Sequence, residues 1–148
     1  MRNFSASLND LYAVCMHTAF IVIPFKESWS DDVTYGIKSV CENLGIDAKR
    51  ADDLFDTQQT ITQDIIKGIC QAELVIVDIT VYNPNVFYEL GIAEALGKDI
   101  ILLHQKDGQK IPSDISNKRY LSYGMFPTSF EKFKKDLGNI IKKIKKAK

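Results

Sequence analysis

The sequence predicts an α/β fold in which helices cover both faces of a five-stranded parallel β-sheet, a flavodoxin-like three-layer sandwich. Two observations predict it. Short, continuously apolar runs, typical of strands buried on both faces, alternate along the 148 residues with amphipathic segments of helical length. Strands that alternate with helices of about ten to fifteen residues are typical of right-handed crossovers and a parallel sheet.

The first half of the chain opens on an apolar run. Residues 18–24 form the first expected strand, because the run is apolar throughout its middle and Pro24 stops it. A helix is expected over 30–45, since a serine and two aspartates precede apolar residues at helical spacing and a glycine ends them. Residues 46–50 form a short second strand.

The second half continues the alternation, and one helix has clear signals at both ends. Asn83 is a good N-cap, Pro84 a good first helical residue, and Gly97 ends the segment after Leu96. The expected elements are, in order, a helix opened by Thr60, a strand over 74–77 closed by Asp78, a helix over 83–96, strands over 100–103 and 120–123, and a closing helix over 129–145.

The composition is that of one ordinary globular domain. Of the residues, 45% are hydrophobic and 26% charged, and the length suits a single domain, expected over 18–148. Residues 1–17 precede it as an N-terminal extension, with a short helix across Leu8 to Cys15 as one option. The 19 basic and 19 acidic residues cancel, so nothing global favours nucleic acid or a membrane.

The sequence also indicates a reduced, cytoplasmic location. No apolar run approaches the ~18–20 residues that a membrane helix needs, and the N-terminus lacks the pattern of a signal peptide. The cysteines Cys15, Cys41 and Cys70 are widely spaced in apolar surroundings, which favours buried reduced thiols. With His17 and His104 they make no plausible zinc set, so no metal site is expected.

Several motifs that would assign a function are absent. There is no G-x-G-x-x-G and no G-x-x-x-x-G-K-[ST], so neither a Rossmann cofactor site nor a P-loop is indicated, and no cofactor is expected. No G-x-S-x-G elbow of a serine hydrolase occurs either. A phosphoacceptor receiver would carry an acidic pair at the end of its first strand, where this chain has Ile23, Pro24 and Phe25.

Polar side chains follow the predicted strands at the edge of the sheet where this architecture binds ligands. In a doubly wound sheet the ligand lies outside the carboxyl ends of the strands, where the strand order reverses. The candidate catalytic residues there are Glu89 and Asp78, and the candidate substrate-binding residues are Pro24, Phe25, Lys26, Arg50, Asp52, Asp53, Asn83, Asn85 and Tyr88.

Glu89 is the most informative of these residues. At 100° per residue it falls in one helical stripe with Val86, Leu90, Ala93 and Leu96, which should face the sheet. A carboxylate facing a core is costly unless it is paired or opens onto a cavity. Glu89 therefore either caps the helix or pairs with a buried cation, or it lines a pocket at the switch point.

The other carboxylates and Arg50 leave alternatives open. Asp78 either caps the loop that follows its strand or lies beside Glu89, where a second carboxylate would raise one of the two pKa values. Asp52 and Asp53 form either a solvated turn or part of the site. Arg50 is either their partner or an anchor for phosphate.

Residues in the loop after the first strand and in the helix after the third also have two possible roles each. Lys26 and Ser28 either meet a phosphate at the next helix start or belong to a polar loop. Trp29 either stacks on a base or covers the loop. Tyr88 points away from the Glu89 stripe, which favours packing.

The closing helix is rich in lysine. Its apolar residues keep helical spacing, so a core-facing helix with a solvated basic face is favoured over contact with nucleic acid or another anionic partner. The lysines concerned are Lys132, Lys134, Lys135, Lys142, Lys143, Lys145, Lys146 and Lys148.

Taken together, several segments resemble the nucleoside 2-deoxyribosyltransferase-like proteins, which are similar in fold to Toll/interleukin-receptor (TIR) domains. The resemblance spans about residues 18–125, and its most specific block runs from Asn83 to Gly91. The segments that carry it are 20–25 (FIVIPF), 50–53 (RADD), 65–69 (IIKGI), 72–78 (AELVIVD), 83–93 (NPNVFYELGIA), 111–114 (IPSD) and 120–123 (YLSY).

The resemblance implies roles and a function. Glu89 would be the nucleophile of the transferases, or the catalytic acid residue of NAD-cleaving TIR domains, and Asp78 would hold the sugar or protonate the leaving base. The implied activity is cleavage or exchange of the N-glycosidic bond of a small-molecule nucleotide, with NAD as the leading substrate. It also suggests a homo-oligomer and a place in bacterial antiphage defence. A deoxyribosyltransferase and a non-catalytic nucleotide sensor or assembly module are the alternatives.

Overall fold

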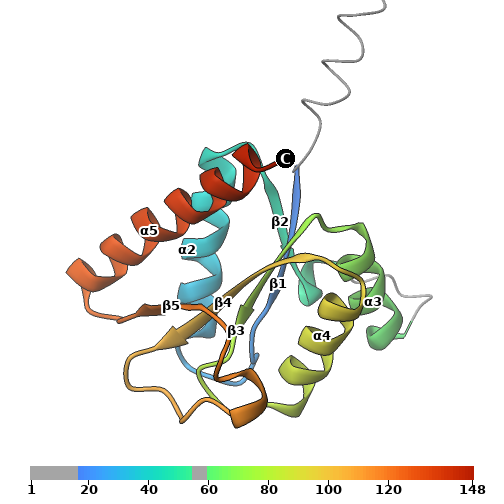
Figure 1. The fold of residues 1–148 in the computed structure, drawn as a ribbon, viewed down its shortest axis with the longest axis horizontal. Coiled ribbons are helices and arrows are strands. Elements are labelled where there is room, and N and C mark those ends of the chain that lie inside the picture. The colour runs from blue at the N-terminus through green and yellow to red at the C-terminus, as the bar shows by residue number, and fades with distance from the viewer. Residues whose placement is uncertain (1–16, 55–59) are drawn as a thin grey trace, which may run out of the picture.

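The computed structural model describes residues 17–54 and 60–148, and its sheet has the predicted architecture (Figure 1). Five parallel strands lie in the order β2-β1-β3-β4-β5. This order reverses between β1 and β3, as in a doubly wound sheet. The strands are β1 (Thr18–Val22), β2 (Asp47–Arg50), β3 (Leu74–Asp78), β4 (Asp99–Gln105) and β5 (Tyr120–Tyr123).

The helices form two layers that sandwich the sheet, with α2 and α5 on one face and α3 and α4 on the other (Figure 1). They are α2 (Ser30–Asn43), α3 (Ile61–Gln71), α4 (Pro84–Ala95) and α5 (Pro127–Lys146), with short 3₁₀ helices η1 (Ala51–Leu54) and η2 (Ser113–Ile115). The predicted α/β sandwich is therefore confirmed.

Successive side chains of the central strands pack alternately into two separate hydrophobic cores. In β1, Ala19 and Ile21 belong to the core beneath α2 and α5, whereas Phe20 and Val22 belong to the core beneath α3 and α4. This is the period-2 alternation of a strand buried on both faces, which explains why the run of apolar residues is continuous.

The residues expected to start and end helices do so. Thr60 caps α3 with a capping box, in which its hydroxyl accepts from the Gln63 amide while the Gln63 side chain accepts from the Thr60 amide. Gly97 follows α4 with a φ of 66°, a left-handed conformation that glycine adopts without strain. These signals are local, so the sequence alone could place them.

Some boundaries and burial assignments differ from expectation. β1 ends at Val22 rather than Pro24, and α5 begins at Pro127 rather than Ser129. Leu96 is exposed because it caps α4 instead of facing the sheet. Cys41 is buried as expected, but Cys70 is exposed near the end of α3, so the expectation of a buried thiol is wrong there.

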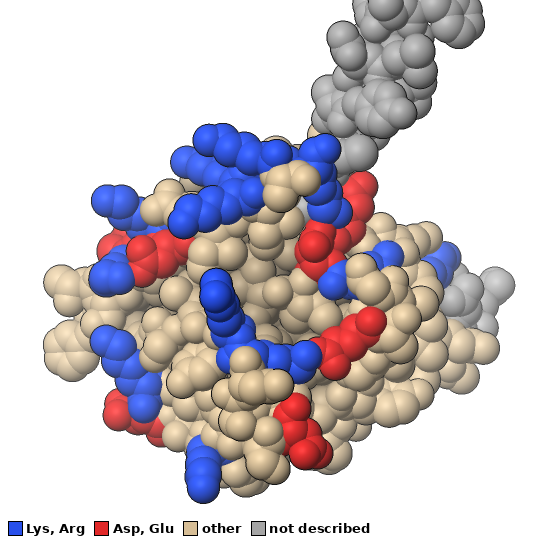
Figure 2. Space-filling model, viewed as in Figure 1, with Lys and Arg blue, Asp and Glu red and all other residues tan. Residues whose placement is uncertain are grey.

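The basic face of α5 is solvated, as the sequence favours. Phe133, Leu137 and Ile141 of α5 are buried in the core shared with α2. Figure 2 shows Lys and Arg side chains gathered over this helix at the upper edge of the view, and the exposed ones include Lys142 and Lys143.

The N-terminal extension expected over 1–17 lies outside the described residues apart from His17. Among the helices described, none combines the length and the apolar character needed to cross a bilayer.

Candidate active site

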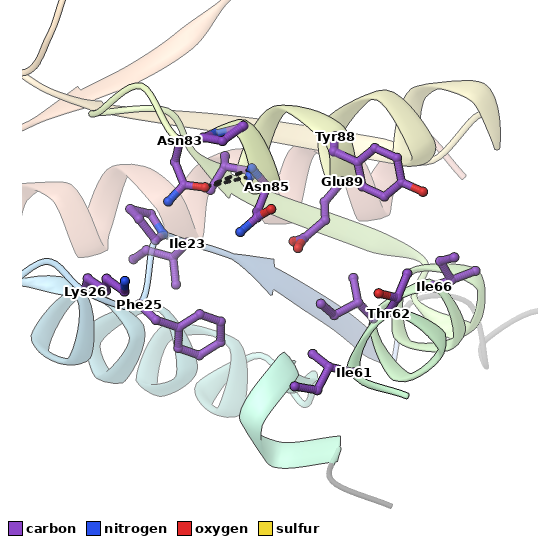
Figure 3. A pocket seen from close by; sticks show the side chains of 14 residues that line it. Ile23, Phe25, Lys26, Ile61, Thr62, Ile66, Asn83, Asn85, Tyr88 and Glu89 are labelled. Atoms are coloured by element: carbon purple, nitrogen blue, oxygen red, sulfur yellow. Dashed lines mark hydrogen bonds between the residues drawn. The ribbon is translucent and has the colours of Figure 1, made fainter. Parts of the chain in front are cut away.

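A cavity of about 490 Å³ opens where the loops after β1 and β3 meet the start of α3 (Figure 3). This is the switch point between β1 and β3, where a doubly wound sheet binds its ligand, and the volume lies in the ~300–1,000 Å³ range of ligand pockets. The lining residues are Ile23, Pro24, Phe25, Lys26, Ile61, Thr62, Ile65, Ile66, Asn83, Pro84, Asn85, Val86, Tyr88 and Glu89.

A buried hydrogen bond anchors the loop after β1. The Ser30 hydroxyl is fully buried and donates to the carbonyl oxygen of Pro24, which ties the start of α2 to the end of the strand. Phe25 and Lys26 follow Pro24 directly and therefore project from an anchored backbone into the mouth of the cavity.

The loop after β3 is fixed by an N-cap. The Asn83 side-chain oxygen accepts from the Asn85 amide at 3.0 Å and from the Val86 amide at 3.2 Å, and Pro84 occupies the first helical turn (Figure 3). This cap sets where α4 begins and hence the direction in which Glu89, in its second turn, points.

Glu89 directs its carboxylate into the cavity, beside the amide of Asn85 (Figure 3). The side chain is half-buried, and no residue that the structure describes gives it a hydrogen bond or an ion pair. Burial alone raises the pKa of Glu89 to about 7. A carboxylate without a partner among the described residues, in a largely apolar cavity, is typical of a site that stabilises or attacks a positive centre.

The charged groups of the cavity lie on opposite walls. Among the described lining residues, only Lys26 and Glu89 carry charge. Lys26 comes from the loop after β1 and Glu89 from α4, with Asn83 and Asn85 between them (Figure 3). The arrangement suits a ligand with an anionic group at one end and an electron-poor carbon at the other.

Two aromatic side chains form part of the rim. Phe25 is 52% exposed and Tyr88 is 60% exposed, and both line the cavity. The Tyr88 hydroxyl points away from the Glu89 carboxylate (Figure 3). Tyr88 therefore contributes ring surface at the rim rather than a polar group beside the carboxylate.

Asp78 lies outside the cavity. Its side chain is 1% exposed; one carboxylate oxygen accepts from the Thr80 amide at 2.9 Å and the other from the Tyr123 hydroxyl. Burial raises the pKa of Asp78, while the bonds from Thr80 and Tyr123 act in the opposite direction. The structure does not bring this carboxylate together with Glu89, and it gives Asp78 the capping role that was the sequence alternative.

Arg50, Asp52 and Asp53 are also not part of the cavity lining. The Arg50 guanidinium binds both carboxylate oxygens of Asp52 and one of Asp31, and Asp53 pairs with Lys38 at 2.5 Å. The pKa of Asp52 is lowered mainly by its hydrogen bond from Arg50. Arg50 is thus the partner of an aspartate, and it approaches the site only through Phe25, over whose ring its guanidinium lies.

One wall of the cavity was not among the candidates. The wall is formed by Ile61, Thr62, Ile65 and Ile66 of α3, a segment that the sequence predicted only as a helix opened by Thr60. An apolar helix face has the same spacing whether it covers a sheet or a cavity, so the sequence held no signal that separates the two. Trp29 and Ser28 do not line the cavity, and Trp29 packs against the core beneath α2.

No group of three or more His, Cys, Asp or Glu side chains within the described ranges is arranged to hold a metal ion.

The fold is shared with an N-glycosidase, a deoxyribosyltransferase and a TIR domain. A CMP N-glycosidase from Clostridium botulinum matches 81% of this chain and 97% of its own, with a TM-score of 0.55 and 16% identity. A 2-deoxyribosyltransferase from Bacillus psychrosaccharolyticus matches 72% and 85%, with a TM-score of 0.57 and 16% identity. The TIR domain of a Toll-related receptor from Hydra magnipapillata matches 82% and 98%, with a TM-score of 0.58 and 15% identity.

The 2-deoxyribosyltransferase and the TIR domain are of the two groups that the sequence resembles, and the implied fold is confirmed. No protein-family model and no curated protein sequence matches the chain.

Proposed function

We propose that this protein breaks or exchanges the N-glycosidic bond of a nucleotide, with NAD as the leading substrate and Glu89 as the catalytic carboxylate. One observation carries the proposal: the Glu89 carboxylate points, half-buried and without a partner among the described residues, into a cavity of nucleotide size. The shared fold of the CMP N-glycosidase and the 2-deoxyribosyltransferase supports the class of reaction.

The chemistry follows that of a retaining glycosidase. Ionised Glu89 attacks the anomeric carbon, or supports its positive charge, while the carbon–nitrogen bond breaks and the electron pair leaves with the base. Water then releases the sugar and regenerates the carboxylate, or a second base takes the place of water. Lys26 on the opposite wall would hold a phosphate of the substrate.

The position of Asp78 favours NAD over ordinary nucleosides. A purine or pyrimidine leaves well only when it is protonated, whereas nicotinamide is already cationic in NAD and departs as a neutral molecule. Asp78 is buried away from the cavity, and the described lining residues offer no second carboxylic acid. Substrates whose leaving group needs no proton therefore suit this cavity best.

The deciding experiment is a turnover panel of NAD, ribonucleotides and deoxynucleosides, followed by chromatography at high protein concentration. Wild type should release nicotinamide from NAD, and Glu89→Gln should lower kcat/KM by about a thousandfold or more. Glu94→Gln is the matched control, because Glu94 lies on the same helix but pairs with Lys118 at 2.5 Å, outside the cavity lining.

Base exchange between deoxynucleosides without NAD cleavage would instead support the transferase alternative. Saturable nucleotide binding without any product would support the sensor alternative. Equal turnover by wild type and Glu89→Gln would contradict the assignment of Glu89.

A further inference from the structure

Phe25 is an exposed aromatic side chain that is nevertheless held in place. The residue is 52% exposed at the mouth of the cavity, so burial alone does not fix the position of its ring. The Arg50 guanidinium carbon lies 4.9 Å from the centre of the ring. A cation at this distance over an aromatic face is attracted by the quadrupole of the ring, so Arg50 restrains Phe25.

Arg50 itself has little freedom to move. Its side chain is only 11% exposed. Nε donates to Asp52 at 2.7 Å and a terminal nitrogen donates to the other Asp52 oxygen at 2.5 Å, a bidentate pair. The second terminal nitrogen donates to Asp31 at 2.8 Å and to the Thr34 hydroxyl at 3.2 Å. The guanidinium is therefore anchored to both α2 and η1.

The two faces of the Phe25 ring have different neighbours. Arg50 is not among the residues that line the cavity, whereas Phe25 is. In Figure 3 the ring lies at the lower wall of the cavity, toward Ile61 and across from Asn85 and Glu89. The guanidinium lies over one face of the ring, so it does not cover the other.

We propose that Arg50 is a positioning residue that holds Phe25 as a flat platform on which the heterocycle of the substrate stacks. The inference rests on the proposed function, because it assumes that a nucleotide occupies the cavity. Stacking of a base on an aromatic side chain tolerates different heterocycles, since every base has a π-face. The platform would hold the leaving group, while Lys26 and Glu89 act on the phosphate and the sugar.

The charge around Arg50 argues against a direct role in binding phosphate. Asp31, Asp52 and Asp53 surround it with three carboxylates, against the two cations Arg50 and Lys38. Asp52 and Asp31 occupy its Nε and both terminal nitrogens and raise the pKa of the guanidinium, chiefly through the hydrogen bond to Asp52. A phosphate brought here would meet net negative charge.

The test compares two probes that differ only in the heterocycle, nicotinamide mononucleotide and ribose 5-phosphate. Their dissociation constants are measured by calorimetry in the Glu89→Gln background, which should prevent turnover. Phe25→Leu should weaken binding of the mononucleotide roughly tenfold and Arg50→Met roughly fivefold, and neither should change binding of ribose 5-phosphate by more than about twofold.

A double variant and a matched control separate a positioning role from a general one. If Arg50 acts through Phe25, the double variant Phe25→Leu/Arg50→Met should bind the mononucleotide no more weakly than Phe25→Leu alone. Lys38→Met breaks a neighbouring ion pair that does not touch Phe25 and should leave both dissociation constants unchanged. Arg50→Lys, which keeps the cation but loses the bidentate pair, should recover part of the affinity.

Equal weakening of both probes by Arg50→Met would identify a phosphate anchor and overturn the proposal. So would additive losses in the double variant, or a mononucleotide that binds no more tightly than ribose 5-phosphate. If Arg50→Met does not fold, as judged by thermal unfolding, Asp31→Asn removes one anchor at an exposed residue and should give a smaller loss of the same selectivity. A different result would contradict the proposed function alone: wild type binds the mononucleotide more tightly than ribose 5-phosphate but cleaves no substrate.

Discussion

The raised pKa of Glu89 comes from its burial rather than from a partner among the described residues. Burial raises its pKa to about 7, so near neutral pH the carboxyl group is divided between its protonated and ionised forms. Because attack on the anomeric carbon requires the ionised form, kcat/KM for NAD should rise as pH increases through about 7 and level off above it. A profile that is flat across this range, in an active enzyme, would contradict a titrating Glu89.

The same raised pKa predicts the opposite trend for stability. The folded protein binds more protons at Glu89 than the unfolded chain does between the ordinary value of 4.5 and about 7. The contribution of Glu89 to the free energy of unfolding is therefore fully present below 4.5 and is lost as pH rises through about 7. Urea unfolding should show wild type losing stability relative to Glu89→Gln between pH ~5 and ~8. A constant difference would contradict it.

Asp78 is predicted to act on stability and not on the reaction. Asp78→Asn keeps an oxygen for the Thr80 amide but replaces the oxygen that accepts from the Tyr123 hydroxyl, and should cost about 1–3 kcal/mol of unfolding free energy. Steady-state kinetics of the folded variant should stay within about twofold of wild type. Tyr123→Phe removes the donor of the same hydrogen bond and should have a similar effect on stability. A lower kcat for Asp78→Asn at unchanged stability would instead support a catalytic role for Asp78.

At the scale of elements, the approach of α3 to β1 depends on a glycine. A Cβ atom on Gly68 would lie 2.5 Å from the Phe20 ring and 2.7 Å from the Leu54 side chain. Both distances are shorter than carbon atoms that are not bonded to each other can approach, so one of the groups would have to move. Gly68→Ala should therefore destabilise the protein by about 1–3 kcal/mol through overpacking.

Gly91→Ala is the matched control for Gly68→Ala. Gly91 lies in α4 with open space around the added Cβ, so alanine there should stabilise the helix by about 0.5–1 kcal/mol. Thermal unfolding of the two variants tests whether Gly68→Ala lowers stability and Gly91→Ala raises it. Equal effects would mean that α3 can move away from the sheet.

The elements that the sequence placed well are those with local signals. The Asn83 cap, Pro84 and Gly97 delimit α4 within a few residues, and continuous apolar runs identify β1 and β3. What could not be placed depends on tertiary geometry. Arg50, Asp52 and Asp53 were grouped with the site because they follow a strand, yet β2 lies at the edge of the sheet and its loop reaches the cavity only through Phe25.

At the scale of the whole molecule, the helical walls of the cavity lie on one face of the sheet. The cavity lies between loops at the switch point and is walled by α3 and α4, whereas α2 and α5 close a core that includes none of the helical lining residues. The lysines of α5 lie on the solvent side of the layer that α2 and α5 form (Figure 2). Apart from the start of α2, which anchors the loop after β1 and Arg50, substitutions in that layer should therefore affect stability rather than activity.

Leu137→Ala tests this separation. Leu137 is fully buried between α5 and the sheet, so its truncation should lower the free energy of unfolding by about 2–5 kcal/mol. Since the core around it does not reach α3 or α4, KM and kcat for NAD should stay within about twofold at temperatures where the variant is folded. Lys142→Ala, at an exposed position of the same helix, should change neither quantity. A raised KM in Leu137→Ala at full folding would show that the α2–α5 layer shapes the cavity, and the two faces would then have to be treated as one coupled unit.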